Sequence, residues 1–307
     1  MPRNSLTAPP SRCLVMGIVN VTPDSFSGDG LGRESDIPQA AVDQARAMVA
    51  AGADILDIGG ESTRPGADPV SEADEMARVV PVVAAIRAAL PDIALSVDTY
   101  KAPVMAAALD AGADIANDVW ALRADTDMGP MLAKRDCPVI LMHNRSKPGH
   151  AEIDRRLGGS YVAPDYGDDF LGTFLDEMRA IAAQAISVGI DASRIVLDPG
   201  VGFGKTPDQN MVLIDAIDVL RDLGYPVLLA ASRKSFMGKV LNLPADDRLE
   251  TTLATTALAV QRGAVGVRVH DVAENSKLIR MTEAVLASGG AARARHGLSN
   301  AGGKAWR

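Results

Sequence analysis

The chain has 307 residues, and 47% of them are hydrophobic, which is enough apolar material for one large core. Its formal net charge of −8 argues against a nucleic-acid partner, because phosphate backbones attract clustered Lys and Arg. No apolar run reaches the roughly 20 residues that a membrane-spanning helix needs, and residues 1–11 lack the apolar core of a secretory signal. We therefore expect a cytoplasmic protein with no membrane partner and a flexible N-terminus over residues 1–11.

The two cysteines, Cys13 and Cys137, stand at the starts of apolar runs. Their spacing is not that of a metal-binding pair. In a reducing compartment such residues usually pack as small hydrophobes, so we predict that both are buried filler.

Eight short apolar runs, rich in Val, Ile or Leu, recur along the chain and are separated by segments with helical spacing. The runs cover residues 14–20, 55–58, 94–98, 115–119, 139–143, 195–198, 227–231 and 265–270. Runs that are apolar on both faces are what a parallel sheet covered by helices requires. Eight strand–helix units predict a single-domain α/β fold, a closed (β/α)₈ TIM barrel over residues 12–287.

The segments between the runs include amphipathic, Ala-rich stretches at residues 39–51, 70–90 and 174–188, which predict helices. Two segments depart from this pattern. Residues 146–172 are charged and aperiodic, which predicts an excursion over the mouth of the barrel. Residues 288–307 contain no acidic residue and predict a mostly disordered tail.

The carboxyl ends of the predicted strands carry polar side chains, although the strands themselves are apolar. These residues are Asn20, Asp57, Asp98, Asn117, His143, Asp198, Ser232 with Arg233 and Lys234, and Arg268 with His270. Barrels of this type build their sites at that rim. Any one of these side chains could be a cap or a loop hydrogen bond, but a whole polar ring favours a functional site.

The stretch Asp198–Thr206 reads DPGVGFGKT and superficially suggests a phosphate-binding P-loop. Such a loop needs Gly five residues before the Gly-Lys-Thr, and Pro199 stands there. The glycines instead predict a backbone that passes close to a flat ligand, with Phe203 available to pack on it.

A second loop, Gly59–Gly66, reads GGESTRPG. Its amides, hydroxyls and Arg64 suit an anionic oxygen cluster such as a pyrophosphate, and the alternative is a polar turn with Arg64 in a salt bridge.

The spacing of the four histidines is not that of a zinc site. Arg268 and His270 can point the same way out of a strand, which also suits anionic oxygens.

Several stretches together resemble one family. They read MGIVNVTPDSF, DIGGESTRPG, SVDTYK, ANDV, DPGVGFGK, ASRKSFMG and RVHDV. At these residues the sequence strongly resembles the bacterial dihydropteroate synthases, pterin-binding TIM-barrel enzymes of folate biosynthesis. The matches extend from Met16 to about Val272 and fall at nearly every predicted strand end.

The resemblance implies a transferase of an alkyl group other than methyl. Its substrates would be (7,8-dihydropterin-6-yl)methyl diphosphate, a pterin diphosphate, and 4-aminobenzoate, and its products 7,8-dihydropteroate and diphosphate. It also implies a Mg²⁺ cofactor, inhibition by sulfonamides and a homodimer.

The resemblance further implies the contacts of the pterin. Asp198 would accept the N–H groups of the aminopyrimidine edge, and Asp98 and Asn117 would complete the edge contacts. Lys234 would reach the pterin carbonyl and border the benzoate pocket. Met142 would form an apolar wall.

The implied diphosphate site consists of five residues: Asn20, Thr63, Arg64, Arg268 and His270. Mg²⁺ would bridge the diphosphate to the Asn20 amide oxygen, with Asp57 nearby through water. Catalysis would then be stabilisation of the leaving group, with Lys234, Asn20, Arg268 and His270 as the catalytic set. An aniline is a neutral nucleophile, so no general base is required.

The implied benzoate pocket lies between two loops. Phe26, Pro65, Phe203 and Lys234 would surround the ring. The carboxylate would meet Ser232 and the N-terminus of the following helix. Sulfonamides would compete for this pocket.

Two other functions are compatible with part of the pattern. A methyltransferase that uses methyltetrahydrofolate and a corrinoid partner would share the Asp and Asn contacts, but has no use for STRPG, the SRKS lysine or RVH. A non-catalytic pterin-binding paralogue would be expected to have lost Asn20, Arg64, Lys234 or His270, and all four are present.

Two stretches depart from the family pattern. Ser27–Gly30 reads SGDG where SDGG is more common in the family, and the region after His143 also diverges. Both departures bear on loop motion and inhibitor sensitivity.

Overall fold

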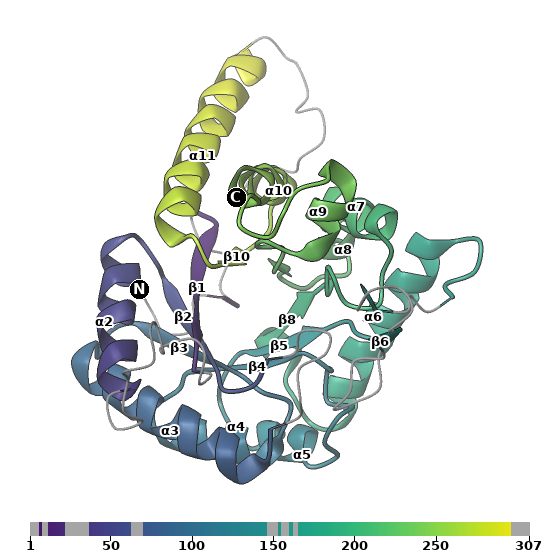
Figure 1. Cartoon of the computed structure of the whole chain (residues 1–307). Helices are drawn as coiled ribbons and strands as arrows, with labels where there is room; N and C mark the ends of the chain where they lie inside the picture. Colours follow the sequence, from purple (N-terminus) through teal and green to yellow (C-terminus); the bar gives the residue numbers. More distant parts are fainter. Residues whose placement is uncertain are drawn as a thin grey trace.

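A computed structural model describes residues 6–7, 12–21, 37–62, 70–145, 153–154, 160–161 and 165–295. A ring of parallel strands is surrounded by helices (Figure 1). The strands are β1 (Leu14–Asn20), β2 (Ile55–Gly59), β3 (Ala94–Asp98), β4 (Ile115–Asp118), β5 (Val139–Met142), β8 (Ile195–Asp198), β9 (Leu228–Leu229) and β10 (Gly266–Val269). Their order is β8-β5-β4-β3-β2-β1-β10-β9, and a parallel bridge between Leu197 and Val227 joins the two ends. The predicted (β/α)₈ barrel is therefore confirmed.

Helices follow the strands and cover the outside of the ring (Figure 1). They are α2 (Ile37–Ala50), α3 (Glu72–Ala89), α4 (Ala102–Asp110), α5 (Met128–Ala133), α6 (Phe170–Ser187), η4 (Ala192–Arg194), α7 (Pro207–Asp215), α8 (Ile217–Arg221), α9 (Ser235–Leu241), α10 (Leu249–Arg262) and α11 (Val272–Arg295). Local sequence sets several of their starts. The hydroxyl of Thr206 accepts the amide of Gln209, whose side chain accepts the amide of Thr206, so a capping box begins α7.

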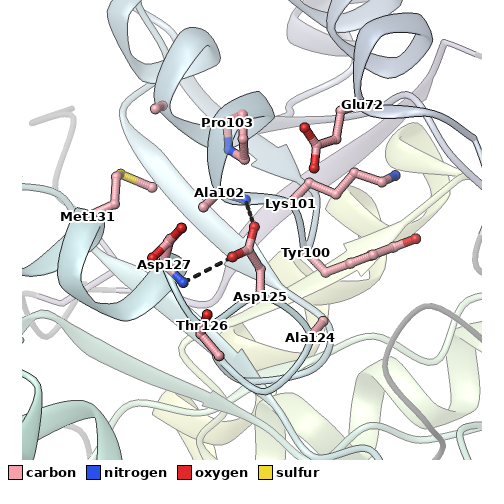
Figure 2. A pocket seen from close by; sticks show the side chains of 11 residues that line it. Glu72, Tyr100, Lys101, Ala102, Pro103, Ala124, Asp125, Thr126, Asp127 and Met131 are labelled. Atoms are coloured by element: carbon pink, nitrogen blue, oxygen red, sulfur yellow. Dashed lines mark hydrogen bonds between the residues drawn. The ribbon is translucent and has the colours of Figure 1, made fainter.

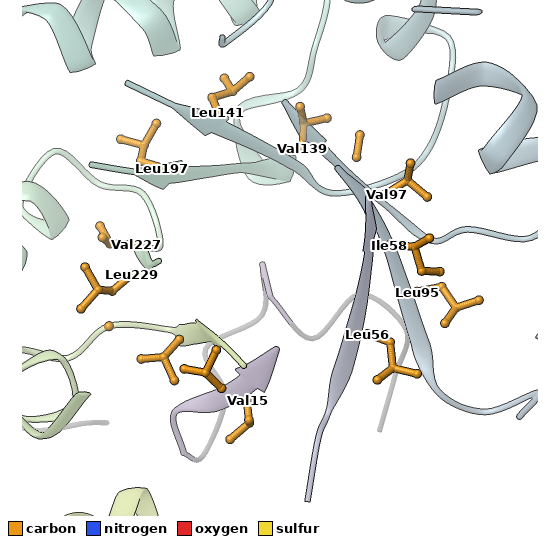
Figure 3. Packing of buried hydrophobic residues seen from close by; sticks show 14 of the residues in the cluster. Val15, Leu56, Ile58, Leu95, Val97, Val139, Leu141, Leu197, Val227 and Leu229 are labelled. Carbon is orange, nitrogen blue, oxygen red and sulfur yellow. The ribbon is translucent and has the colours of Figure 1, made fainter. Parts of the chain in front are cut away.

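The outward side chains of the strands form the core between the ring and the helices. Val15, Leu56, Leu95, Val139 and Leu197 all belong to this layer and are fully buried (Figure 3). Because side chains alternate across a strand, the intervening residues point into the barrel. Near the strand starts these inward residues are apolar and form a second buried cluster.

One residue of the predicted flexible N-terminus lies in that inner cluster. Leu6 is fully buried and packs with inward residues such as Leu14, Leu228 and Val265. The expectation of flexibility over residues 1–11 is therefore wrong at Leu6, because an apolar side chain close to the open base of a barrel gains by filling it. The predicted burial of Cys13 and Cys137 is confirmed.

Two boundaries differ from the prediction, and one strand pair was not expected. Helix α6 begins at Phe170, earlier than expected, and the preceding excursion contains two short antiparallel strands, β6 (Ile153–Asp154) and β7 (Ser160–Tyr161). Helix α11 continues to Arg295, into the segment predicted to be disordered. Its last residues are rich in Ala and Arg, which favour helix, and this outweighs the two glycines there.

Candidate functional site

The carboxyl ends of the strands bring the predicted polar residues to one rim. Asn20 is the last residue of β1, and Asp98 pairs in register with Asn117 across β3 and β4. Met142 of β5 pairs in the same way with Asp198 of β8. These side chains continue the inward-facing rows whose earlier members are apolar. The interior of the barrel therefore changes from apolar at the base to polar at the mouth.

Arg268 lies at the centre of this polar layer. Its Nε donates to Asp57 Oδ2 at 2.5 Å, and its Nη2 donates to Asp98 Oδ2 at 2.7 Å. The amide of Asn117 lies 3.3 Å from both oxygens of Asp57, which is fully buried. Burial lowers the pKa of Arg268, but the two carboxylates more than offset this and hold it above its ordinary value. Burial raises the pKa of Asp98 to about 7 in spite of the attraction of Arg268.

Asp198 and Lys234 attract each other electrostatically in the next part of the rim. Asp198 Oδ1 accepts the amide of Gly200 at 2.7 Å, and burial raises the pKa of the carboxyl. Lys234 Nζ donates to the carbonyl of Val201 and lies 4.5 Å from the ring centroid of Phe203, a cation–π contact. Burial lowers the pKa of Lys234 to about 8, against the attraction of Asp198.

Ser232 and His270 form a third group between β9 and β10. Ser232 Oγ accepts the backbone amide of His270 at 3.2 Å and lies 3.1 Å from its Nδ1. The hydroxyl is nearly buried, so this pair fixes the His270 ring beside the strand ends. Lys234 immediately precedes α9, which begins at Ser235.

Two members of the predicted ring lie elsewhere. The ring of His143 bonds to Glu177 of α6 at 2.7 Å and packs on Phe174, so it faces the helix layer. This follows from alternation, because its neighbour Met142 points inward. Arg233, at a positive φ of 54°, pairs with Asp271. Neither side chain joins the polar layer inside the barrel.

The structure adds aromatic residues that the sequence pattern did not single out. Tyr100 and Trp120 meet edge to face with centroids 4.8 Å apart, and they cluster with Val119 and Met142, against which Phe203 packs. The sequence did carry a signal for Trp120, which closely follows ANDV in a chain that is only 4% aromatic. These residues supply an apolar wall to one side of the polar rim.

An unusual turn presents Trp120. The carboxylate of Asp118 accepts the amides of Trp120 and Leu122 at 2.9 and 2.8 Å, and it holds Ala121 and Leu122 at positive φ. Residues other than glycine rarely adopt that backbone conformation, and such strain is concentrated at functional sites. Nothing in the strand periodicity could indicate this turn.

Four predicted contacts, Phe26, Thr63, Arg64 and Pro65, lie outside the described residues. The first residues of the second loop, 59–62, are described. Glu61 forms an ion pair with Lys101 and accepts the hydroxyl of Tyr100 at 3.1 Å. Lys101 also donates to Glu75 of α3 at 2.5 Å. The start of this loop is thus anchored to the chain segment after β3.

A separate hollow of about 640 Å³ lies among the starts of α3 and α4 and the segment that leads into α5 (Figure 2). Asp125 accepts the amides of Ala102 and Asp127 at 2.8 and 2.9 Å, so its charge is already engaged (Figure 2). None of the predicted site residues lines this hollow.

The donors that could hold Mg²⁺ are few. Within the described part of the chain, His, Cys, Asp and Glu form no group of three or more that could bind a metal. Both oxygens of Asp57 are engaged by Arg268 and Asn117, so this carboxylate is poorly suited to direct ligation. The Asn20 oxygen remains, which fits an ion that takes most of its ligands from phosphate and water.

Comparison with known proteins adds independent information. A family model described as pterin binding enzyme matches residues 16–270. The dihydropteroate synthase of Bacillus subtilis is 43% identical over 279 residues, which is 91% of this chain and 90% of that protein. The dihydropteroate synthase of Xanthomonas albilineans, solved with 4-aminobenzoic acid, gives a TM-score of 0.80 at 41% identity over 90% and 94% of the two chains.

A third similar protein was solved with an inhibitor. The dihydropteroate synthase of Yersinia pestis, in complex with a sulfonamide drug, gives a TM-score of 0.79 at 38% identity. The match covers 90% of this chain and 95% of that one.

Among the described residues, no helix is long and apolar enough to cross a membrane.

Proposed function

The chain belongs to the dihydropteroate synthases within the pterin-binding enzymes, and on this premise we propose the chemistry of its site. The reaction joins (7,8-dihydropterin-6-yl)methyl diphosphate to 4-aminobenzoate, in folate biosynthesis. The comparisons favour neither a corrinoid-dependent methyltransferase nor a non-catalytic paralogue.

One observation carries the assignment of the pterin pocket. Carboxylates from β2 and β3 bind Arg268 inside the barrel mouth, and an amide from β4 binds the first of them. The carboxylate of Asp198, from β8, adds to the negative charge around Arg268. Asp198 uses one oxygen for Gly200 and has further acceptor capacity for the paired N–H groups of an aminopyrimidine. We assign the remaining edge atoms to Asp98 and Asn117, which are adjacent in register.

The departing diphosphate is assigned to the cationic side of the rim. Arg268 and His270 lie two residues apart at the end of β10, and Asn20 ends the neighbouring strand β1. We expect Thr63 and Arg64 to complete this side. Mg²⁺, when bound at the Asn20 oxygen, would neutralise charge on the diphosphate as its bond to carbon breaks. The cations of this chain stabilise the same charge in a buried, pre-organised site.

The arylamine is assigned to the space beside Phe203 and Lys234. The two side chains are already in contact, and the Ser232 hydroxyl lies next to His270 at the rim. We expect Phe26 and Pro65 to close this pocket. Because the Xanthomonas albilineans relative was solved with 4-aminobenzoic acid and the Yersinia pestis relative with a sulfonamide, we propose that both classes of ligand compete here in this chain.

Incubation with both substrates and Mg²⁺ tests the reaction directly. We expect dihydropteroate and diphosphate in equal amounts, detected by mass spectrometry and by a phosphate assay after pyrophosphatase treatment. A chain that binds the pterin diphosphate but forms no dihydropteroate would refute the assignment and favour a non-catalytic role.

We also propose a homodimer and a cytoplasmic location. Large apolar side chains on α9 and α11 are exposed, including Leu241, Met281 and Val285, and a second copy of the chain would cover them. Light scattering after size exclusion should give twice the mass of the chain.

The proposed cytoplasmic location is supported by the two cysteines, which are buried and free, as is typical of proteins in a reducing compartment.

A further inference from the structure

Lys205, the last residue of DPGVGFGK, is a buried cation to which the proposed chemistry gives no role. The residue is only 8% exposed. Nζ donates to three backbone carbonyls, those of Gly200 and Phe203 at 3.0 Å and that of His143 at 3.3 Å. Among the described residues it forms no ion pair. Burial lowers the pKa of Lys205 to about 7, against the attraction of Asp198, and the three carbonyls are the partners that stabilise the protonated form.

The three carbonyls belong to two different strand ends. His143 follows β5, whereas Gly200 and Phe203 lie in the loop after β8. The peptide of Gly200 is held from both sides, because its amide donates to Asp198 at 2.7 Å and its carbonyl accepts from Lys205. A Cβ at Gly200, where φ is +64°, would lie 1.9 Å from the His143 carbonyl oxygen. The loop therefore lies directly on the end of β5, and Lys205 joins the two.

A second ammonium binds the same loop. Lys234 donates to the carbonyl of Val201 and covers the ring of Phe203. In the proposed function Lys234 is assigned to the substrates. Lys205 has no such assignment, and its Nζ is bonded to carbonyls of the loop and of the strand end beneath it.

We propose that Lys205 is a positioning residue, whose ammonium fixes the loop after β8 so that Asp198 and Phe203 face the two substrates. This proposal rests on the proposed function. Without the ammonium, three carbonyls lose a donor, and a buried carbonyl left unpaired is unfavourable. The loop is then expected to relax away from β5, and Phe203, whose carbonyl is one of the three, is expected to shift with it.

The test compares Lys205→Met, Lys205→Arg and the control Lys134→Met, which changes an exposed lysine at the end of α5. We expect Lys205→Met to lower kcat/KM for 4-aminobenzoate roughly 10- to 100-fold, the range associated with a small misplacement of binding groups. Lys205→Arg should recover part of this loss, because a guanidinium also donates to carbonyls. The control should match the wild type.

Amide hydrogen exchange gives a readout that does not depend on turnover. We expect faster exchange over residues 199–206 in Lys205→Met and unchanged rates in the control. If Lys205→Met does not fold, Lys205→Gln replaces it. A lowered melting temperature with unchanged KM values and unchanged exchange in this loop would reduce Lys205 to a stabilising residue and overturn the proposal. If the wild type makes no dihydropteroate, the proposed function fails, whereas the exchange comparison still decides whether Lys205 holds the loop.

Discussion

Replacement of Arg268 by Met is expected to destabilise the barrel mouth in a way that depends on pH. The substitution keeps an unbranched side chain but removes both bonds of the guanidinium, to Asp57 and to Asp98. Asp57 is fully buried, so it keeps only Asn117 as a partner among the contacts described above. Removal of one member of a buried ion pair lowers the free energy of unfolding by about 3–5 kcal/mol. We expect a loss in this range at pH 8.

The pH dependence follows from Asp98. Its pKa is about 7 in the wild type, raised by burial against the attraction of Arg268, and it should rise further in the variant. A carboxyl with a higher pKa in the folded than in the unfolded state binds more protons when folded, so the free energy of unfolding falls as pH rises between the two values. Because that window is wider in the variant, the difference from wild type should be larger at pH 8 than at pH 5.5.

Urea denaturation of both proteins at the two pH values measures this difference. A matched control is Arg179→Met, which breaks an exposed ion pair with Asp176 and should lower the free energy of unfolding by about 0–1 kcal/mol at either pH. A loss for Arg268→Met no larger than the control, or one that grows toward low pH, would refute the account of Arg268 as the counter-charge of Asp57 and Asp98.

Three further outcomes are expected at the site. Lys234→Ala should lower kcat by about 10²–10³, the scale of a lost electrostatic contact, while circular dichroism stays unchanged; near-normal turnover would remove its assigned role. Chelation of Mg²⁺ by EDTA should weaken binding of diphosphate in a calorimetric titration, and an unchanged titration would argue against a metal at Asn20. A sulfonamide should raise the apparent KM for 4-aminobenzoate without lowering the maximal rate, and purely noncompetitive kinetics would contradict a shared pocket beside Phe203.

The sequence predicted the barrel and the polar rim because both depend on local patterns. Strand runs that are apolar on both faces indicate a covered parallel sheet, and strand ends such as Asn20 and Asp198 can be read directly. Where the end of a strand was uncertain, the sequence did not predict which of its last residues point inward. His143 and Arg233 were therefore included in the predicted polar ring, although both side chains face away from the polar layer.

The contacts inside the rim could not be predicted, because they join residues that are distant in the chain. Arg268 lies 211 positions from Asp57 and 170 from Asp98, and no periodicity encodes such a pairing. The turn that presents Trp120 was missed for a different reason. Its left-handed residues are Ala121 and Leu122, whereas a sequence usually marks positive φ with Gly or Asn.

The burial of Leu6 has a consequence for how the protein is made. This leucine precedes its neighbours Leu228 and Val265 of the inner cluster by more than 200 positions in the chain, so it is translated well before them. Until those strands have been made, the base of the barrel is incomplete and Leu6 has no buried position to occupy. We therefore expect this leucine to become buried late in folding, after β9 and β10 have joined the sheet.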